Sequence, residues 1–299
     1  MTPLKLGVIG LSDGNGHPYS WSAIFNGYDP VHMDNCGFPV ISSYLAKQHF
    51  PKDSINEAKV THVWAQSNEI ATHIAKATLI PNIVENYTNM IGEIDGLLLA
   101  RDDAETHLVF ATPFLNAGIP IYIDKPLALN VLEAEKLINM QCYPGQIFSC
   151  SALRFAKEFK LSITDWMQIG HLRQIHAMSP KEWDKYAIHV IEPMLLIANE
   201  SGSIESTKAW QQDDSTTLAV KYKSGLQFLI TTTGTTQAPI TLRVMGDSGW
   251  KDLFFQDTFF TFKTALFEFV QGIIHRDVRI STDSMLKVIS IIELGRVDK

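Results

Sequence analysis

Residues 95–103 read Asp-Gly-Leu-Leu-Leu-Ala-Arg-Asp-Asp, and residues 117–128 read Ala-Gly-Ile-Pro-Ile-Tyr-Ile-Asp-Lys-Pro-Leu-Ala. Each stretch holds a short apolar run, at 97–100 and at 119–123, and a helix-like segment lies between the two runs. This order is typical of a strand, a crossover helix and a second strand. Neither run alternates with polar residues, so both strands should be covered on both faces, as in a parallel sheet. The two stretches therefore predict a doubly wound α/β domain.

Charged side chains follow both predicted strands. Arg101 and Asp102 come after the first strand, and Asp124 and Lys125 come after the second. Ligands of doubly wound sheets bind beyond the carboxyl ends of the strands. We therefore expect Lys125 to face a ligand. The alternative is that Lys125 only pairs with Asp102 or Asp103 for stability.

The run at 117–128 resembles the signature of the glucose-fructose oxidoreductase and inositol dehydrogenase (Gfo/Idh/MocA) family, which is normally written Ala-Gly-Lys-His-Val-x-x-Glu-Lys-Pro-Leu-Ala. The resemblance extends over most of the chain and is strongest at 94–135. It implies an NAD(P)-dependent oxidoreductase with two domains. These are an N-terminal Rossmann dinucleotide-binding domain at 1–126, and a C-terminal α+β domain at 127–299 that binds substrate and carries a large, open, mainly antiparallel sheet.

The bulk properties also favour a protein that acts on a small molecule. A length of 299 residues suggests two domains. The net charge is −7 and there is no run of Lys or Arg, which argues against nucleic acid or an anionic membrane as a partner. No apolar segment reaches the roughly 18 residues that span a bilayer, and the N-terminus leads directly into a predicted strand. We expect a cytoplasmic protein.

A glycine-rich turn follows the first predicted strand, at 4–9. The dinucleotide fingerprint has glycine at its first, third and sixth places, so that the backbone can turn and approach the pyrophosphate. Gly10 fits the first place, and Ser12 and Asn15 occupy the other two, with further glycines beside them. Serine is small and asparagine tolerates unusual dihedral angles, so we interpret the turn as a cofactor-binding loop. An ordinary flexible turn is the alternative.

Past the next predicted strand, at 59–64, come Ala65, Gln66 and Ser67. An acid at this point binds the ribose 2′-hydroxyl of NAD, and a basic residue admits the 2′-phosphate of NADP. Neither is present, so the choice between NAD and NADP stays open. The expected cofactor-binding residues are Gly10, Ser12, Gly14, Asn15, Gln66, Arg101, Asp124 and Lys125.

The segment at 26–56 is rich in glycine and proline and is inserted after the first strand and helix. Such insertions can cover an active site, so it is a candidate lid or substrate-recognition segment. His32, Asp34 and Cys36 alternate within it, but nothing pairs them with a fourth ligand, so we expect no metal site. The odd number of cysteines, which also include Cys142 and Cys150, indicates reduced thiols packed in the interior.

The C-terminal half has the pattern of an α+β domain. We predict a strand at 146–153, a helix at 155–168 and a strand at 171–178. Runs rich in Thr, Val and aromatic residues, broken by glycine turns, predict antiparallel strands at 217–222, 225–233 and 240–246. Two helices follow, at 258–275 and 282–294. In the family such a sheet pairs with another subunit, so the resemblance implies a homodimer or homotetramer.

Residues 183–193 hold the second candidate site. A helical period places Lys185, His189 and Glu192 on one face. The family's counterpart reads Asp-x-Gly-x-His-x-x-Asp, in which His189 takes the histidine place and Glu192 that of the second acid. Lys185 stands where the first aspartate should be, which reverses a charge, and Tyr186 adds a hydroxyl group. The alternative is a structural His189 that Glu192 satisfies.

Together these residues predict hydride transfer between a nicotinamide and a hydroxyl or ketone carbon of a sugar, cyclitol or sugar-derived metabolite. As hydride leaves the carbinol carbon, a base near neutral pKa speeds loss of the O–H proton, and His189 suits that task. Lys125 would hold the developing oxyanion. Catalytic roles thus fall to Lys125, His189, Lys185 and Tyr186, and substrate binding to Arg154, Glu192 and His17.

Other interpretations stay open. His17 could contact the substrate or the cofactor, or it could cap a helix and pack on Trp21. A regulator on the same fold would sense a dinucleotide or a sugar without reacting. A third class is a carbohydrate-binding or scaffold protein with no cofactor.

Overall fold

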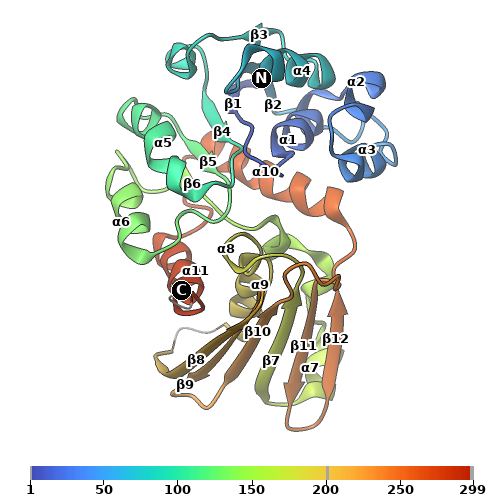
Figure 1. The fold of residues 1–299 in the computed structure, drawn as a ribbon, viewed down its shortest axis with the longest axis vertical. Helices are drawn as coiled ribbons and strands as arrows, with labels where there is room; N and C mark the ends of the chain where they lie inside the picture. The colour runs from blue at the N-terminus through green and yellow to red at the C-terminus, as the bar shows by residue number, and fades with distance from the viewer. Residues whose placement is uncertain (1, 200–201, 297–299) are drawn as a thin grey trace. The chain divides into compact units, whose positions relative to one another are not determined.

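A computed structural model describes residues 2–199 and 202–296 (Figure 1). The chain forms two compact units. The first contains the chain up to residue 128 together with 132–150 and 262–285, and the second contains the remainder. This division differs from the single boundary predicted after residue 126, because residues 132–150 and 262–285 also pack in the first unit.

The first unit is built on a parallel sheet of six strands with the order β3-β2-β1-β4-β5-β6 (Figure 1). Each pair of neighbours is parallel. The strands are β1 (Leu4–Ile9), β2 (Ala58–Trp64), β3 (Asn82–Ile83), β4 (Gly96–Leu99), β5 (Ile121–Ile123) and β6 (Ile147–Phe148). Every residue of β4 and β5 is buried, as the apolar runs predicted. The predicted Rossmann-type sheet is confirmed, and its order reverses between β1 and β4.

Helices connect the strands of this unit. They are α1 (His17–Asn26), α4 (Asn68–Thr78), α5 (His107–Asn116), α6 (Val131–Asn139) and the short 3₁₀ helices η1 (Tyr87–Met90) and η2 (Ala104–Thr106). The Ser67 side chain caps α4 by accepting a hydrogen bond from the backbone N–H of Ile70. Gly118 has φ of +73° directly after α5, the backbone conformation that ends helices at glycine.

The inserted segment at 26–56 contributes two further helices, α2 (Pro30–Asp34) and α3 (Pro39–Leu45). They pack on α1 and α4, with Met33 and Leu45 completely buried. A Cβ atom at Gly16 would come within 2.5 Å of Ile41 Cδ1 and 2.7 Å of Phe38 Cγ. The segment thus packs directly on the loop before α1, as part of the core of this unit.

The second unit contains the predicted large sheet, with the order β12-β11-β7-β10-β9-β8 (Figure 1). All neighbouring pairs are antiparallel except β7 with β10. The strands are β7 (Leu172–Ser179), β8 (Ile204–Gln212), β9 (Ser215–Tyr222), β10 (Gln227–Thr232), β11 (Thr241–Gly246) and β12 (Trp250–Phe254). The mainly antiparallel sheet is confirmed, and β12 is a strand that the sequence pattern did not reveal.

Further helices complete this unit. They are α7 (Ile163–Ile169), α8 (Trp183–Tyr186), α9 (Ile188–Ala198), and the 3₁₀ helices η3 (Ala152–Phe155) and η4 (Lys157–Phe159). The C-terminal helices α10 (Thr258–His275) and α11 (Thr282–Leu294) have the predicted bounds. From residue 262 onward α10 belongs to the first unit, and α11 belongs to the second unit from residue 286 onward. Trp183 donates its indole N–H to the carbonyl of Ile292, which fixes α8 on α11. No helix within the described part of the chain is long and apolar enough to cross a membrane.

Two predictions at the start of the C-terminal half are wrong. The expected strand at 146–153 is reduced to β6, which pairs with β5 in the first sheet. The expected helix at 155–168 begins only at Ile163, because Ser162 and Asp165 form a capping box that fixes the start of α7.

We predict that Gly16→Ala lowers the free energy of unfolding by about 1–3 kcal/mol, because the new methyl group overpacks the contact with α3. Chemical denaturation measures the loss. The double variant Gly16→Ala/Ile41→Val removes the nearest atom of the neighbour, so its loss should be smaller than the sum of the two single losses. Additive losses would contradict this account of the contact.

Candidate functional site

The loops after β1, β4 and β5 meet at the point where the order of the first sheet reverses. This is where open α/β sheets bind ligands. At the end of β1, a Cβ atom on Gly10 would lie 2.1 Å from Pro18 Cγ, so only glycine fits this close approach to α1. Gly10 therefore stands at the first place of the fingerprint and allows the end of β1 to pack closely on α1.

A tight turn follows, from Ser12 to Asn15. It is closed by a hydrogen bond of 3.1 Å from the Asn15 N–H to the Ser12 carbonyl. Gly14 has φ of +72°, and no atom lies within 4 Å of the place that its Cβ would take. Asp13 and Gly14 are exposed, so the tip of the turn is open to a ligand.

The side chains of this turn bind two buried acids. Ser12 donates its hydroxyl to Asp102 Oδ1 at 2.8 Å and accepts the Asp102 backbone N–H at 3.1 Å. Asn15 donates its amide to Asp124 Oδ2 at 2.8 Å. The loop after β1 is therefore tied to the ends of β4 and β5.

His17 belongs to the same network. Its Nδ1 lies 2.5 Å from Asp124 Oδ2, and its ring stacks on Trp21 with 5.0 Å between centroids. Burial alone would raise the pKa of Asp124, but the charges of His17 and Lys125 and the hydrogen bonds from His17 and Asn15 hold it well below its usual range. The sequence left two roles for His17, contact with a ligand or packing on Trp21. The structure shows the packing on Trp21.

Lys125 is buried at the end of β5. Its Nζ lies 3.5 Å from Asp102 Oδ2, and its backbone N–H donates to Asp124 Oδ1 at 2.8 Å. The pairing with Asp102, which the sequence left as the structural alternative to a ligand contact of Lys125, is present. An ammonium group and two carboxylates thus share a nearly dry site, in which electrostatic effects are stronger than in water.

Arg101 and Gln66 hold the backbone of Leu11 from two neighbouring loops. Arg101 donates from Nη1 to the Leu11 carbonyl at 2.9 Å, and Gln66 Oε1 accepts the Leu11 N–H at 2.9 Å. Arg101 also forms a two-point ion pair with Asp103 and lies over the ring of Phe110. Of the predicted cofactor-binding residues, all eight therefore lie in the loops around the reversal point.

These residues fit a dinucleotide in position and in charge, but the phosphate contacts differ from those of the common fingerprint. The His17 N–H is taken by the Asn15 side chain, Pro18 has no N–H, and the N–H groups of Tyr19 and Ser20 bond to the Gly16 carbonyl. The backbone N–H groups in the first turn of α1 are therefore already hydrogen-bonded within the protein. The open tip at Gly14 and the guanidinium of Arg101 are the groups that would hold a pyrophosphate.

In the second unit, a buried cluster surrounds α9. Glu192 accepts the Ser151 N–H at 2.5 Å on one oxygen and Arg154 Nη1 at 3.1 Å on the other. His189 Nδ1 lies 2.7 Å from Ser151 Oγ. The predicted residues Arg154, His189 and Glu192 are therefore joined through Ser151. Sequence reasoning missed Ser151, because a lone serine after a short strand gives no pattern.

Tyr186 lies beside His189, with ring centroids 5.2 Å apart in an edge-to-face arrangement. Lys181, whose φ is +64°, donates from Nζ to the Tyr186 hydroxyl at 2.5 Å. Lys185 and Tyr186 are the last two residues of α8. Ala187 separates this helix from α9, which carries His189. The neighbouring acid, Asp184, pairs with Arg296 at 3.2 Å.

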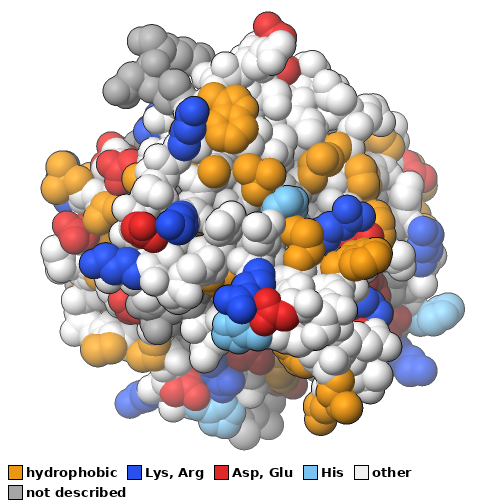
Figure 2. Space-filling view, turned by 90° about the horizontal axis from the view of Figure 1, so that it is seen from below, with side chains coloured by type: hydrophobic (Ala, Val, Ile, Leu, Met, Phe, Trp, Pro, Cys, Tyr) orange, Lys and Arg blue, Asp and Glu red, His pale blue; other side chains and the backbone are white. Residues whose placement is uncertain are grey.

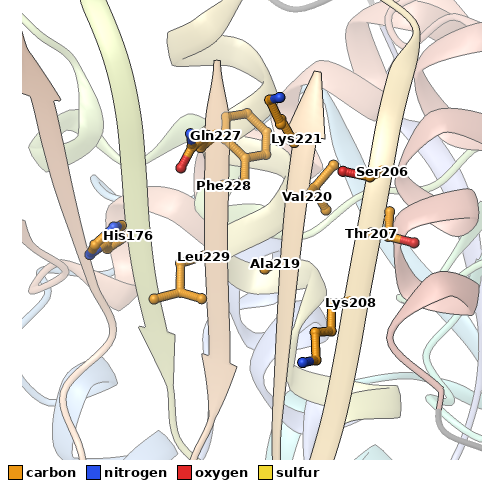
Figure 3. A pocket seen from close by; sticks show the side chains of 10 residues that line it. All are labelled: His176, Ser206, Thr207, Lys208, Ala219, Val220, Lys221, Gln227, Phe228 and Leu229. Atoms are coloured by element: carbon orange, nitrogen blue, oxygen red, sulfur yellow. The ribbon is translucent and has the colours of Figure 1, made fainter. Parts of the chain in front are cut away.

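Two hollows lie elsewhere, on the outer face of the second sheet. The one in Figure 3 has a volume of about 290 Å³ and is lined from β7, β8, β9 and β10, with His176, Lys208 and Leu229 among its residues. The other, of about 280 Å³, is lined by Met178, Arg243 and neighbouring residues. Neither contains a residue of the predicted site. Among residues 2–199 and 202–296, no three His, Cys, Asp or Glu side chains could hold a metal ion.

The three cysteines are thiols that form no disulfide, as predicted. Cys36 and Cys150 are buried, but Cys142 is exposed in the turn after α6, so the prediction of interior packing is wrong for that residue.

Comparison with known proteins agrees with this geometry. Residues 39–150 match the model of the Gfo/Idh/MocA family, described as an oxidoreductase family with an NAD-binding Rossmann fold. Over these residues, the chain is similar to this family. The family description also confirms the predicted dinucleotide cofactor, and the choice between NAD and NADP stays open.

A curated relative, YceM of Salmonella typhimurium, is named as a presumed oxidoreductase and is 32% identical over 77 residues. The match covers 26% of this chain and 24% of the relative, so it spans about a quarter of that protein.

Three solved structures share the fold over nearly the whole chain. The myo-inositol 2-dehydrogenase of Lactobacillus plantarum has a TM-score of 0.74 at 15% identity, over 97% of this chain and 95% of that one. The scyllo-inositol dehydrogenase of Lactobacillus casei, solved with NAD(H) and scyllo-inositol, has a TM-score of 0.69 at 14% identity, over 97% and 95%. UDP-N-acetylglucosamine 3-dehydrogenase of Acidithiobacillus ferrooxidans has a TM-score of 0.67 at 15% identity, over 99% and 97%.

The carboxyl group of Glu192 provides a test of this cluster. Burial raises its pKa to about 7 from an ordinary value of 4.5, against the opposing pull of Arg154 and the Ser151 N–H. The folded chain therefore keeps a proton that the unfolded chain loses. We predict that the contribution of Glu192 to the free energy of unfolding falls by about 2–3 kcal/mol as the pH rises from 4.5 to 7.

Denaturation across this pH range measures the slope. Glu192→Gln has no titrating carboxyl, so its unfolding free energy should fall less with pH than that of the unchanged chain. Asp124 does not interfere, because its lowered pKa places its contribution below pH 4. Equal slopes in both proteins would contradict the burial effect.

Proposed function

We propose that this chain is an NAD(P)-dependent oxidoreductase that transfers hydride to or from a hydroxyl or ketone carbon of a sugar, cyclitol or sugar-derived metabolite. The observation that carries the proposal is the buried side chain of Lys125, whose Nζ lies 3.5 Å from Asp102 Oδ2 at the strand ends of the Rossmann-type sheet. The inositol and amino-sugar dehydrogenases that share the fold act on substrates of this class.

Lys125 and His189 are assigned to the reacting carbon. When bound, the nicotinamide supplies or accepts the hydride. The Lys125 ammonium stabilises negative charge that develops on the substrate oxygen, an effect that is largest where water is excluded. His189 either exchanges the hydroxyl proton or donates a hydrogen bond to the oxygen, and Tyr186 and Lys185 flank it. Substrate binding is assigned to Arg154, Glu192 and His17.

We predict that Lys125→Met lowers turnover by about 100-fold or more and leaves dinucleotide affinity largely unchanged. Methionine keeps the length of the side chain but removes the charge. Absorbance at 340 nm with a panel of sugars and cyclitols measures turnover, and fluorescence titration with NADH and NADPH measures affinity. The matched control Lys47→Met changes an exposed lysine. Turnover equal to that of the control would remove Lys125 from the reaction.

A sensing protein that binds a dinucleotide without turnover is the second candidate. It is favoured by the internally bonded first turn of α1, by the neutral Gln66 after β2 and by Lys185 in place of an acid. Titration with NAD, NADH, NADP and NADPH, followed by the substrate panel, separates the two functions. Tight binding with no turnover across the panel would favour the sensor.

We further propose that the outer face of the second sheet pairs with a second copy of this chain, to give a homodimer or homotetramer. The strand registers align an uncharged row across all six strands, composed of Trp210, Thr217, Thr231, Met178, Thr241 and Phe254. Trp210 and Phe254 are 45% and 50% exposed in the single chain. Figure 2 shows hydrophobic side chains exposed among charged ones on the surface seen from below.

We predict that Met178→Asp, in the centre of this row, converts the oligomer to single chains, because a charge buried between two sheets is strongly unfavourable. Light scattering after size-exclusion chromatography measures the mass. Val40→Asp is the matched control, since Val40 is exposed on α3 and is not part of this sheet. An unchanged mass of the Met178→Asp variant would exclude this face as the interface.

A further inference from the structure

We propose that Ser151 is a positioning residue that holds the imidazole of His189 in the tautomer with its hydrogen on Nε2. His189 then meets a substrate oxygen as a hydrogen-bond donor and not as a base. This inference rests on the function proposed above and deepens it, because it replaces the base role that the sequence suggested for His189.

Ser151 contacts both functional side chains of α9. It is completely buried. Its hydroxyl lies 2.7 Å from His189 Nδ1, and its backbone N–H donates to Glu192 Oε2 at 2.5 Å. The hydroxyl oxygen also accepts the N–H of Leu153 at 3.2 Å, at the start of η3. One residue thus fixes the orientation of both His189 and Glu192.

The hydrogen-bond capacity of the hydroxyl decides the tautomer. A serine hydroxyl has one hydrogen to donate and two lone pairs. Leu153 uses one lone pair. If His189 carries its hydrogen on Nε2, then Nδ1 is an acceptor and the Ser151 hydroxyl donates to it. Every group of the Ser151 side chain then has a suitable partner.

The other tautomer leaves a group unsatisfied. With the hydrogen on Nδ1, the ring would donate to Ser151 Oγ, and the hydroxyl hydrogen would need a new acceptor. Among the contacts of the residues that the structure describes, Ser151 Oγ has none besides Leu153 and His189. A buried hydroxyl without an acceptor is unfavourable enough to lower the population of that state by roughly fivefold or more.

Neighbouring groups agree with this assignment. Both oxygens of Glu192 accept hydrogen bonds from other groups, namely Arg154 and the Ser151 N–H. Tyr186 meets the imidazole edge to face. A substrate oxygen that approaches Nε2 of His189 would then meet the hydrogen on that nitrogen. A neutral imidazole with hydrogen on Nε2 can polarise a carbonyl oxygen or stabilise an oxyanion.

The test observes the imidazole nitrogens by heteronuclear NMR of ¹⁵N-labelled protein, at a pH where His189 is neutral and without substrate or cofactor. His189→Gln identifies the signals of residue 189 by their absence. We expect Nε2 to be protonated in the unchanged chain. In Ser151→Ala, the fraction protonated on Nδ1 should rise by about fivefold or more, because the hydroxyl no longer favours one tautomer.

The variants separate positioning from general stability. Ser151→Ala keeps the backbone N–H that binds Glu192, and Ser151→Thr keeps the hydroxyl, so Ser151→Thr should restore the tautomer of the unchanged chain. If Ser151→Ala does not fold, Ser151→Cys supplies the same comparison, because a thiol is a weak donor. A hydrogen on Nδ1 in the unchanged chain, or tautomer fractions that Ser151→Ala leaves unaltered, would overturn the proposal.

This readout is independent of catalysis. If no substrate is turned over with any dinucleotide, the proposed oxidoreductase function fails, while the NMR spectra still decide the role of Ser151. If turnover is found and the tautomer is not controlled by Ser151, the oxidoreductase function stands and the positioning role fails.

Discussion

Two buried carboxylates, Asp102 and Asp124, fix the loop on which the first unit's binding site depends. Each is fully or almost fully buried and lies at the end of a strand, and each accepts hydrogen bonds from the loop after β1. A buried charge without partners costs several kcal/mol, so Lys125 and His17 must stay near these acids. The position of the loop is therefore set by charge compensation as well as by backbone geometry.

The sequence predicted those parts of the fold in which local pattern and tertiary packing agree. The apolar runs at β4 and β5 lack alternation because both faces are buried, and the apolar periods of α10 and α11 end where the helices end. The predictions for residues 146–168 were wrong for the opposite reason. Their apolar pattern continues through Ser151 and Ser162, whose hydrogen bonds to the backbone begin new helical turns.

In the candidate site too, sequence patterns predict some residues and miss their contacts. Signature positions such as Lys125 and His189 could be named from sequence because their spacing resembles a family pattern. The contact of His17 with Asp124 joins residues 107 positions apart, and that of Ser151 with His189 joins residues 38 positions apart. No periodicity connects such pairs, and serine is too common for its position to indicate a role. Only the folded chain brings these partners together.

The first loop uses internally the groups that many dinucleotide-binding loops offer to the cofactor. The Leu11 N–H binds Gln66, the Leu11 carbonyl binds Arg101, and the His17 N–H binds Asn15. A loop held in this way loses little conformational entropy on binding, because it is already ordered. It also has fewer donors for a phosphate. In the proposed function, affinity for a pyrophosphate would therefore depend on Arg101 and on the open tip at Gly14, and the dipole of α1 would contribute less than in loops whose first helical turn is unbonded.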